Sequence, residues 1–159
     1  MFIMSNQGAT LKNKKSAKMG IVSMELAYNK SQTDSIMKEW SIPNEDETGV
    51  AVAIKNTKLD FIYICFYALF LFTAAKAIQK KFGGWFGRQG KWIMKGVLIA
   101  GSLDVLENCG MLLTLNGKGS DTVAMTTSIC SSIKWLLAII AVLYVLIGGV
   151  TSLRRRIST

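Results

Sequence analysis

The chain has 159 residues, of which half are hydrophobic, and it carries a formal net charge of +9 without a single histidine. This length suits one compact domain with tails. The lack of histidine excludes haem ligation by histidine, zinc sites that use histidine and Ser-His-Asp catalysis. Because the hydrophobic residues gather after residue 58, the composition divides the chain into a polar N-terminal tail and an apolar region.

The tail, residues 1–58, is mostly polar and charged. We predict that it is loosely structured, with one short helix over residues 34–40 that stops ahead of the only proline, Pro43. No secretory signal is evident, since the basic residues 12–18 are followed only by a short apolar stretch that Glu25 interrupts. The tail is therefore either cytoplasmic or translocated without such a signal.

Three hydrophobic runs follow the tail, at residues 59–78, 93–115 and 127–150. Each has the ~20 residues that a helix needs to cross a hydrocarbon core about 30 Å thick. A soluble helical core would need polar faces on its helices, and residues 61–75 offer almost none. We therefore predict an all-α integral membrane bundle of three transmembrane helices over residues 59–153, with a basic C-terminal tail at 154–159.

Basic residues crowd the first loop between helices and follow the third helix, which are positions typical of cytoplasmic anchoring charge. This pattern predicts that the first loop and the C-terminus lie inside, and the tail and second loop outside. Because aromatic and basic side chains both favour the lipid headgroups, an interfacial anchor is favoured over a specific lipid site. The predicted anchor consists of Lys80, Lys81, Trp85, Arg88, Lys91 and Trp92. The charge thus indicates membrane lipids as partners rather than nucleic acid.

The three cysteines, Cys65, Cys109 and Cys130, lie in or beside the predicted helices and form no CxxC pair. An odd number without metal-ligand spacing favours buried thiols over a disulfide framework or a metal site. We expect no metal and no cofactor. In the second loop, residues 116–121 predict a turn in which Ser120 or Asp121 caps the third helix.

The second helix carries acidic and amide side chains near its middle, where an ionised group costs at least ~2.5 to 3.5 kcal/mol unless it is partnered. At about 100° per residue, its polar and small residues share one face and its aliphatic residues the other. The predicted inner face consists of Val97, Ala100, Gly101, Asp104, Glu107, Asn108, Met111 and Leu115. The predicted lipid face contains Leu98, Val105, Leu106, Cys109 and Leu113.

The third helix repeats this design with a stripe of small residues, which permits close helix approach. The stripe comprises Thr127, Cys130, Ser131, Lys134, Ala138, Ala141, Val145, Gly148, Gly149 and Ser152. At about 1.5 Å per residue, Glu107 and Lys134 both lie roughly 10 to 12 Å from the outer helix ends. In the first helix Asp60 marks the outer end, and Tyr67 reaches a similar depth. We therefore predict a buried cluster of Tyr67, Asp104, Glu107, Asn108 and Lys134.

Two carboxylates face one lysine in this cluster, so full ionisation would leave a surplus negative charge that a low-dielectric setting resists. One reading is a structural ion pair between Glu107 and Lys134. The other is that the surplus carboxyl carries protons or recognises a ligand.

The segment Asp104-Val105-Leu106-Glu107-Asn108, followed across a loop by Lys134-Trp135-Leu136-Leu137, resembles a motif pair in small, uncharacterised, mainly bacterial multi-spanning membrane proteins. These proteins show D-x-x-E-N in one span and a K-W pair opening the next. The resemblance covers at most residues 93–150. It implies that the polar positions belong together, but it implies no activity. We separately expect a multi-pass location in a bacterial inner membrane.

Three functions fit these features. The first is a non-enzymatic helical subunit or accessory protein, acting as a homo-oligomer or within a larger membrane protein complex. The second is an oligomeric transporter or ion-conducting protein in which Asp104 and Glu107 face a shared cavity. The third is a membrane enzyme that acts on lipid with one of these carboxyls as general acid or base.

Overall fold

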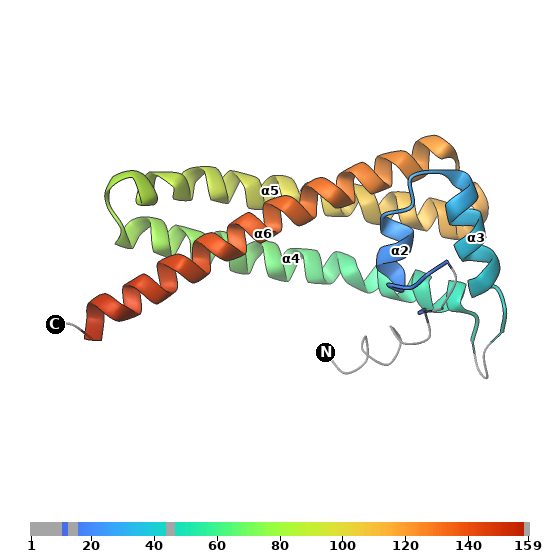
Figure 1. Ribbon diagram of the computed structural model, residues 1–159, viewed down its shortest axis with the longest axis horizontal. Helices are drawn as coiled ribbons and strands as arrows, with labels where there is room; N and C mark the ends of the chain where they lie inside the picture. The colour runs from blue at the N-terminus through green and yellow to red at the C-terminus, as the bar shows by residue number, and fades with distance from the viewer. Residues whose placement is uncertain (1–10, 13–15, 44–46, 158–159) are drawn as a thin grey trace. The chain divides into compact units, whose positions relative to one another are not determined.

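The computed structural model describes residues 11–12, 16–43 and 47–157, with side chains described as far as Arg154 (Figure 1). Over these ranges the order of elements is α2 (Ile21–Glu25), α3 (Lys30–Trp40), α4 (Gly49–Lys81), α5 (Gly84–Leu113), a π-type turn (Thr114–Lys118) and α6 (Asp121–Ile157). Among the described residues, three helices are long and apolar enough to cross a membrane, namely α4, α5 with the turn after it, and α6. The predicted all-α bundle of three long apolar helices is confirmed.

The long helices extend beyond the apolar runs that predicted them. They contain 33, 30 and 37 residues, so at ~1.5 Å per residue each is about 45 to 55 Å long. A hydrocarbon core of about 30 Å is shorter than this. Hydropathy detects only the apolar middle of such a helix, which is why the first turns of α4, with Lys55 and Lys58 exposed, were assigned to the tail.

The chain divides into two compact units, and the three long helices contribute to both. The first unit comprises Met1–Ile62 and Asp104–Ser132, and the second comprises Tyr63–Leu103 and Ile133–Thr159.

In the first unit, the helix predicted over residues 34–40 is confirmed as part of α3, which begins earlier, at Lys30. The expectation of a loosely structured tail is wrong for the rest of α3 and for α2, which form helices. The side chain of Asn29 caps α3 by accepting a hydrogen bond from the Gln32 amide at 2.9 Å. The helix ends at Trp40, whose indole nitrogen donates to the carbonyl of Leu11 at 3.0 Å. These segments fold because their apolar side chains complete a core with α4 and α5. That core contains Leu11, Ala17, Met24, Ala27, Ile36, Trp40, Val52, Ala53, Met111 and Leu115.

Hydrogen bonds also join the tail to the start of α6. The Lys30 amide donates to the Asp121 carboxylate at 2.7 Å, and the Ser128 hydroxyl donates to the carbonyl of Leu26 at 3.2 Å. Ser120 caps α6, since its hydroxyl accepts from the Val123 amide at 3.2 Å. Of the two predicted caps, Ser120 is therefore the one observed.

In the second unit, α4, α5 and α6 meet through small and aromatic residues. The buried core residues are Leu71, Ala75, Ile78, Val97, Ala141 and Tyr144. The rings of Phe86 and Tyr144 stack with their centroids 4.7 Å apart. A Cβ added to Gly148 would overlap the side chain of Ile78. Small residues on α6 thus permit close packing against α4, as the stripe predicted.

Candidate functional site

The polar residues of α5 lie on the buried face of the helix. All eight residues predicted for the inner face are buried, and all five predicted for the lipid face are exposed. Glu107 has no exposed surface, and Asp104 and Asn108 are 5% and 3% exposed. The face assignment is therefore confirmed, and the carboxyl groups of α5 are held inside the protein.

The members of the predicted cluster fall into different units. Asp104, Glu107 and Asn108 belong to the first unit, whereas Tyr67 and Lys134 belong to the second. In the second unit Lys134 is buried, with its ammonium 5.7 Å from the ring centroid of Trp135, and Tyr67 is partly buried beside the core. The pairing of Glu107 with Lys134 and Tyr67 stays a prediction.

The first unit brings Asn108 together with a residue of α4. The side-chain amide of Asn108 donates to the Asp60 carboxylate at 2.8 Å. A second polar contact comes from α2, where Glu25 accepts a hydrogen bond from the Ser131 hydroxyl of α6 at 3.4 Å. Side chains from four helices therefore build a polar interior in this unit.

A cavity of about 150 Å³ lies in this polar interior. Its walls come from α2 and the residues before it, from α4 and from α5. The lining residues are Leu11, Lys12, Met19, Gly20, Ile21, Glu25, Asn56, Thr57, Asp60, Asn108 and Met111. We take this cavity, called the inner cavity below, as the candidate functional site.

Asn56 is the most informative residue of the inner cavity. It is 5% exposed, and its side-chain oxygen accepts no hydrogen bond from any residue that the structure describes. The neighbouring Thr57 donates its hydroxyl proton to the carbonyl of Ala53 at 2.9 Å, so its oxygen can act only as an acceptor toward a further group. A buried acceptor without a donor costs about 1 to 3 kcal/mol, which a bound molecule with N–H or O–H groups would offset.

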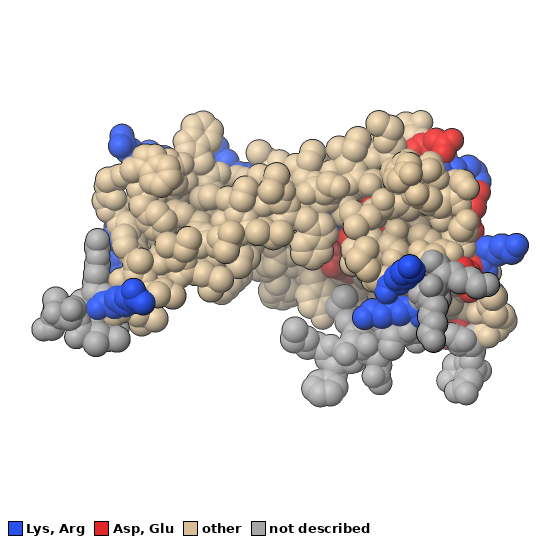
Figure 2. Space-filling view, viewed as in Figure 1, with Lys and Arg blue, Asp and Glu red and all other residues tan. Residues whose placement is uncertain are grey.

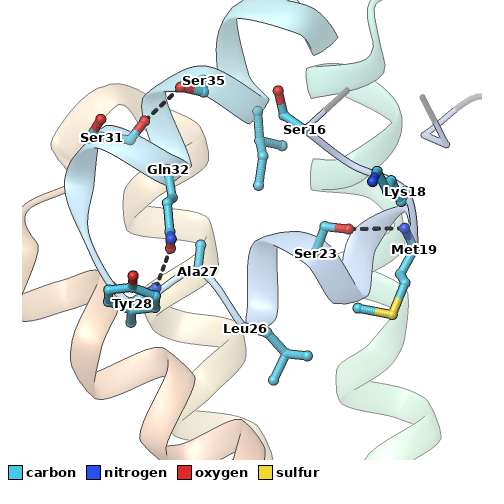
Figure 3. Close-up of a pocket in the computed structure, with 11 residues that line it drawn as sticks. Ser16, Lys18, Met19, Ser23, Leu26, Ala27, Tyr28, Ser31, Gln32 and Ser35 are labelled. Atoms are coloured by element: carbon cyan, nitrogen blue, oxygen red, sulfur yellow. Dashed lines mark hydrogen bonds between the residues drawn. The ribbon is translucent and has the colours of Figure 1, made fainter. Parts of the chain in front are cut away.

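A second depression lies between α2 and α3, with a volume of about 420 Å³ (Figure 3). Its polar groups bond to one another: the Met19 amide donates to the Ser23 hydroxyl, and the Tyr28 amide to the Gln32 side chain, both at 3.0 Å. The Ser35 hydroxyl likewise donates to the carbonyl of Ser31 at 2.8 Å. This depression therefore gives less indication of a ligand than the inner cavity.

Sequence reasoning identified Asn108 but missed Asn56, Thr57 and Glu25. The predicted first span began at residue 59, so all three were assigned to the tail. Asn56 and Asp60 are four residues apart, which places both on one face of a helix that starts before residue 56. Extending the helical pattern toward the N-terminus would have found this pair.

The predicted anchor residues at the loop of the second unit are all exposed. Trp85 and Trp92 are 69% and 67% exposed, and the Lys95 ammonium lies 4.9 Å from the ring centroid of Trp92. On the visible face, Lys and Arg side chains lie near this loop and near the end of α6 (Figure 2). This arrangement suits an interfacial anchor, which stays a prediction.

The cysteines differ from the expectation of buried thiols. All three are unbridged, but only Cys130 is buried, whereas Cys65 and Cys109 are exposed. The expectation is wrong for these two because they fall on the outward faces of α4 and α5, as the pattern of α5 had indicated for Cys109. Within the described ranges, no group of three or more acidic, cysteine or histidine side chains could hold a metal ion.

Comparison with known proteins found no match to a protein-family model, a curated protein or a solved structure.

Proposed function

We propose that this chain is a non-enzymatic, multi-spanning protein of a bacterial inner membrane. It acts as a helical subunit or accessory protein and assembles with copies of itself or with a larger membrane complex. Three helices long and apolar enough to span a membrane support the membrane location. The chain lacks histidine, the most common general acid–base residue, which favours a role without catalysis over the lipid enzyme.

The observation that best supports assembly with another helix is the aromatic face of α4, which we define as Tyr63, Phe66 and Phe70. These side chains are 43%, 69% and 65% exposed and recur at spacings of three and four residues, so they share one side of the helix. Only 17% of the residues in an apolar 18-residue stretch of α4 are buried within the chain. Helix association in lipid depends on packing contacts, and we propose that these three rings pack against another helix.

An oligomeric transporter or ion-conducting protein is a second candidate, favoured by the burial of Asp104 and Glu107 in the first unit. Buried ionisable groups in membrane helices commonly belong to ion or proton pathways. This candidate predicts that Asp104→Asn abolishes flux in proteoliposomes while the size of the assembly stays unchanged. Loss of assembly together with flux would assign Asp104 a structural role instead.

Native mass spectrometry of the protein, extracted gently from its own membrane, tests the assembly. We expect a defined complex, either a closed homo-oligomer or a complex with other proteins. The double variant Phe66→Leu with Phe70→Leu keeps the helix apolar but removes both rings, and it should shift the population toward the monomer. As the matched control, Leu98→Val with Ile99→Val alters exposed residues of α5 and should leave the complex unchanged.

Two results would contradict this account. A wild-type chain that is monomeric and retains only lipid argues against any assembly. A complex that the aromatic double variant leaves intact argues against the aromatic face of α4 as its contact surface.

A further inference from the structure

The charged side chains of this protein are divided unevenly between its two units. All ten acidic residues of the chain belong to the first unit, whereas the charged residues of the second unit are all basic. These basic residues are Lys76, Lys80, Lys81, Arg88, Lys91, Lys95, Lys134, Arg154, Arg155 and Arg156. No acidic side chain within the second unit can neutralise them, so their counter-charge must come from outside the unit.

A groove of about 290 Å³ lies in this basic unit, between the connection of α4 to α5 and the last turns of α6. Phe82 and Phe86 line it on one side, and Ile147, Thr151 and Arg154 of α6 line it on the other. Arg154 is exposed, and no residue that the structure describes forms an ion pair with it. The groove shares no residue with the predicted interfacial anchor. Its guanidinium is therefore available to an anion.

The α6 side of the groove follows the order of groups in a phospholipid. Ile147, Thr151 and Arg154 recur at spacings of four and three residues, so they share one side of the helix. The Thr151 hydroxyl donates to the carbonyl of Ile147 at 2.8 Å, which leaves Arg154 to donate to an anion. From Ile147 to Arg154 the helix rises about 10 Å, and the headgroup layer on each side of a bilayer is about 5 to 8 Å thick. With Ile147 at the edge of the hydrocarbon core, Arg154 reaches the phosphates.

The chemistry of the groove distinguishes between classes of lipid. A guanidinium presents paired N–H donors that match a phosphate, and the rings of Phe82 and Phe86 supply an apolar wall for an acyl chain. Every phospholipid has a phosphate, but a zwitterionic headgroup adds a cation, which the basic side chains of this unit would repel. A headgroup without that cation is attracted to basic residues instead.

We propose that this groove binds one anionic phospholipid, with the Arg154 guanidinium donating to its phosphate and Phe82, Phe86 and Ile147 contacting an acyl chain. A lipid fits better than free phosphate because three of the five lining side chains are apolar. This lipid site presupposes the proposed membrane location, but the two can fail separately. A chain that is soluble without detergent refutes the location, whereas a detergent-dependent chain without a lipid preference refutes the groove alone.

Native mass spectrometry of the full chain in detergent micelles tests the preference. Phosphatidylglycerol and phosphatidylcholine with the same acyl chains are added in equal amounts at about 0.15 M salt, where charges more than about 8 Å apart are largely screened. We expect the chain to retain one phosphatidylglycerol in preference to phosphatidylcholine. Equal retention of both lipids, or of neither, would overturn the proposal. Glycerol phosphate, which lacks acyl chains, should not displace the lipid; displacement at equal concentration would assign the groove to soluble phosphate instead.

Variants of Arg154 test the contact itself. Arg154→Ala should lower the retention of phosphatidylglycerol about tenfold, the scale of a lost hydrogen bond to a charged group. Its Tm should equal that of the wild type, because Arg154 is exposed near the end of α6. The matched control is Lys76→Ala, which removes one positive charge from an exposed residue of the same unit outside the groove and should retain the lipid as the wild type does. Equal losses in both variants would attribute the preference to total charge and refute the groove.

Discussion

Asn108 links two helices of the first unit through its hydrogen bond to Asp60. Because Asn108 is 3% exposed, its removal leaves a carboxylate without this donor. We expect Asn108→Ala to lower the free energy of unfolding by about 1.5 to 3 kcal/mol, as for a hydrogen bond to a charged group. Hydrogen exchange should show the loss as faster exchange in residues 49–62 of α4. Asn116→Ala, at an exposed amide, is the control; equal effects in both variants would argue against the Asp60 contact.

For single residues, the amino-acid sequence predicts burial in some cases and not in others. Asp104, Glu107 and Asn108 were correctly assigned to a buried face, because a helical period separates polar from aliphatic positions without knowledge of the partner helices. Asn56 was missed because the predicted first span began after it, although the helix begins at Gly49. Glu25 was missed because it interrupts a short apolar stretch of the tail, and only tertiary packing places it beside Ser131 of α6.

Within helix α6, two adjacent glycines, Gly148 and Gly149, differ in their surroundings. A Cβ on Gly148 would overlap Ile78 of α4, whereas a Cβ on Gly149 would meet nothing within 4 Å. We therefore expect Gly148→Ala to lower the free energy of unfolding by about 1 to 3 kcal/mol, the usual cost of overpacking. Gly149→Ala, with the same chemical change, should be neutral or mildly stabilising. Denaturant unfolding in micelles measures both, and equal values would contradict close packing at Gly148.

The elements themselves were predictable to different degrees. Long apolar runs identified α4, α5 and α6, since about twenty apolar residues in a row have few alternatives to a spanning helix. The tail was not predictable in this way. Its helices α2 and α3 contain 5 and 11 residues, lengths at which helices are marginal in isolation. They depend on burying Met24, Ile36 and Trp40 against the long helices.

For the whole molecule, we propose that the chain crosses the membrane three times, with the tail and second loop on one side and the first loop and C-terminus on the other. Cysteine labelling tests this directly. The background chain has Cys65, Cys109 and Cys130 replaced by serine, and single cysteines are introduced at the exposed positions Ser41, Gly83, Lys118 and Arg154.

A membrane-impermeant maleimide is then applied to intact cells and, separately, to disrupted membranes. We expect labelling of the Ser41→Cys and Lys118→Cys variants in intact cells, and labelling of the Gly83→Cys and Arg154→Cys variants only after disruption. The reverse pattern would preserve three crossings and overturn the orientation. Labelling of all four positions from one side, or recovery of the chain in the soluble fraction, would contradict the three membrane crossings.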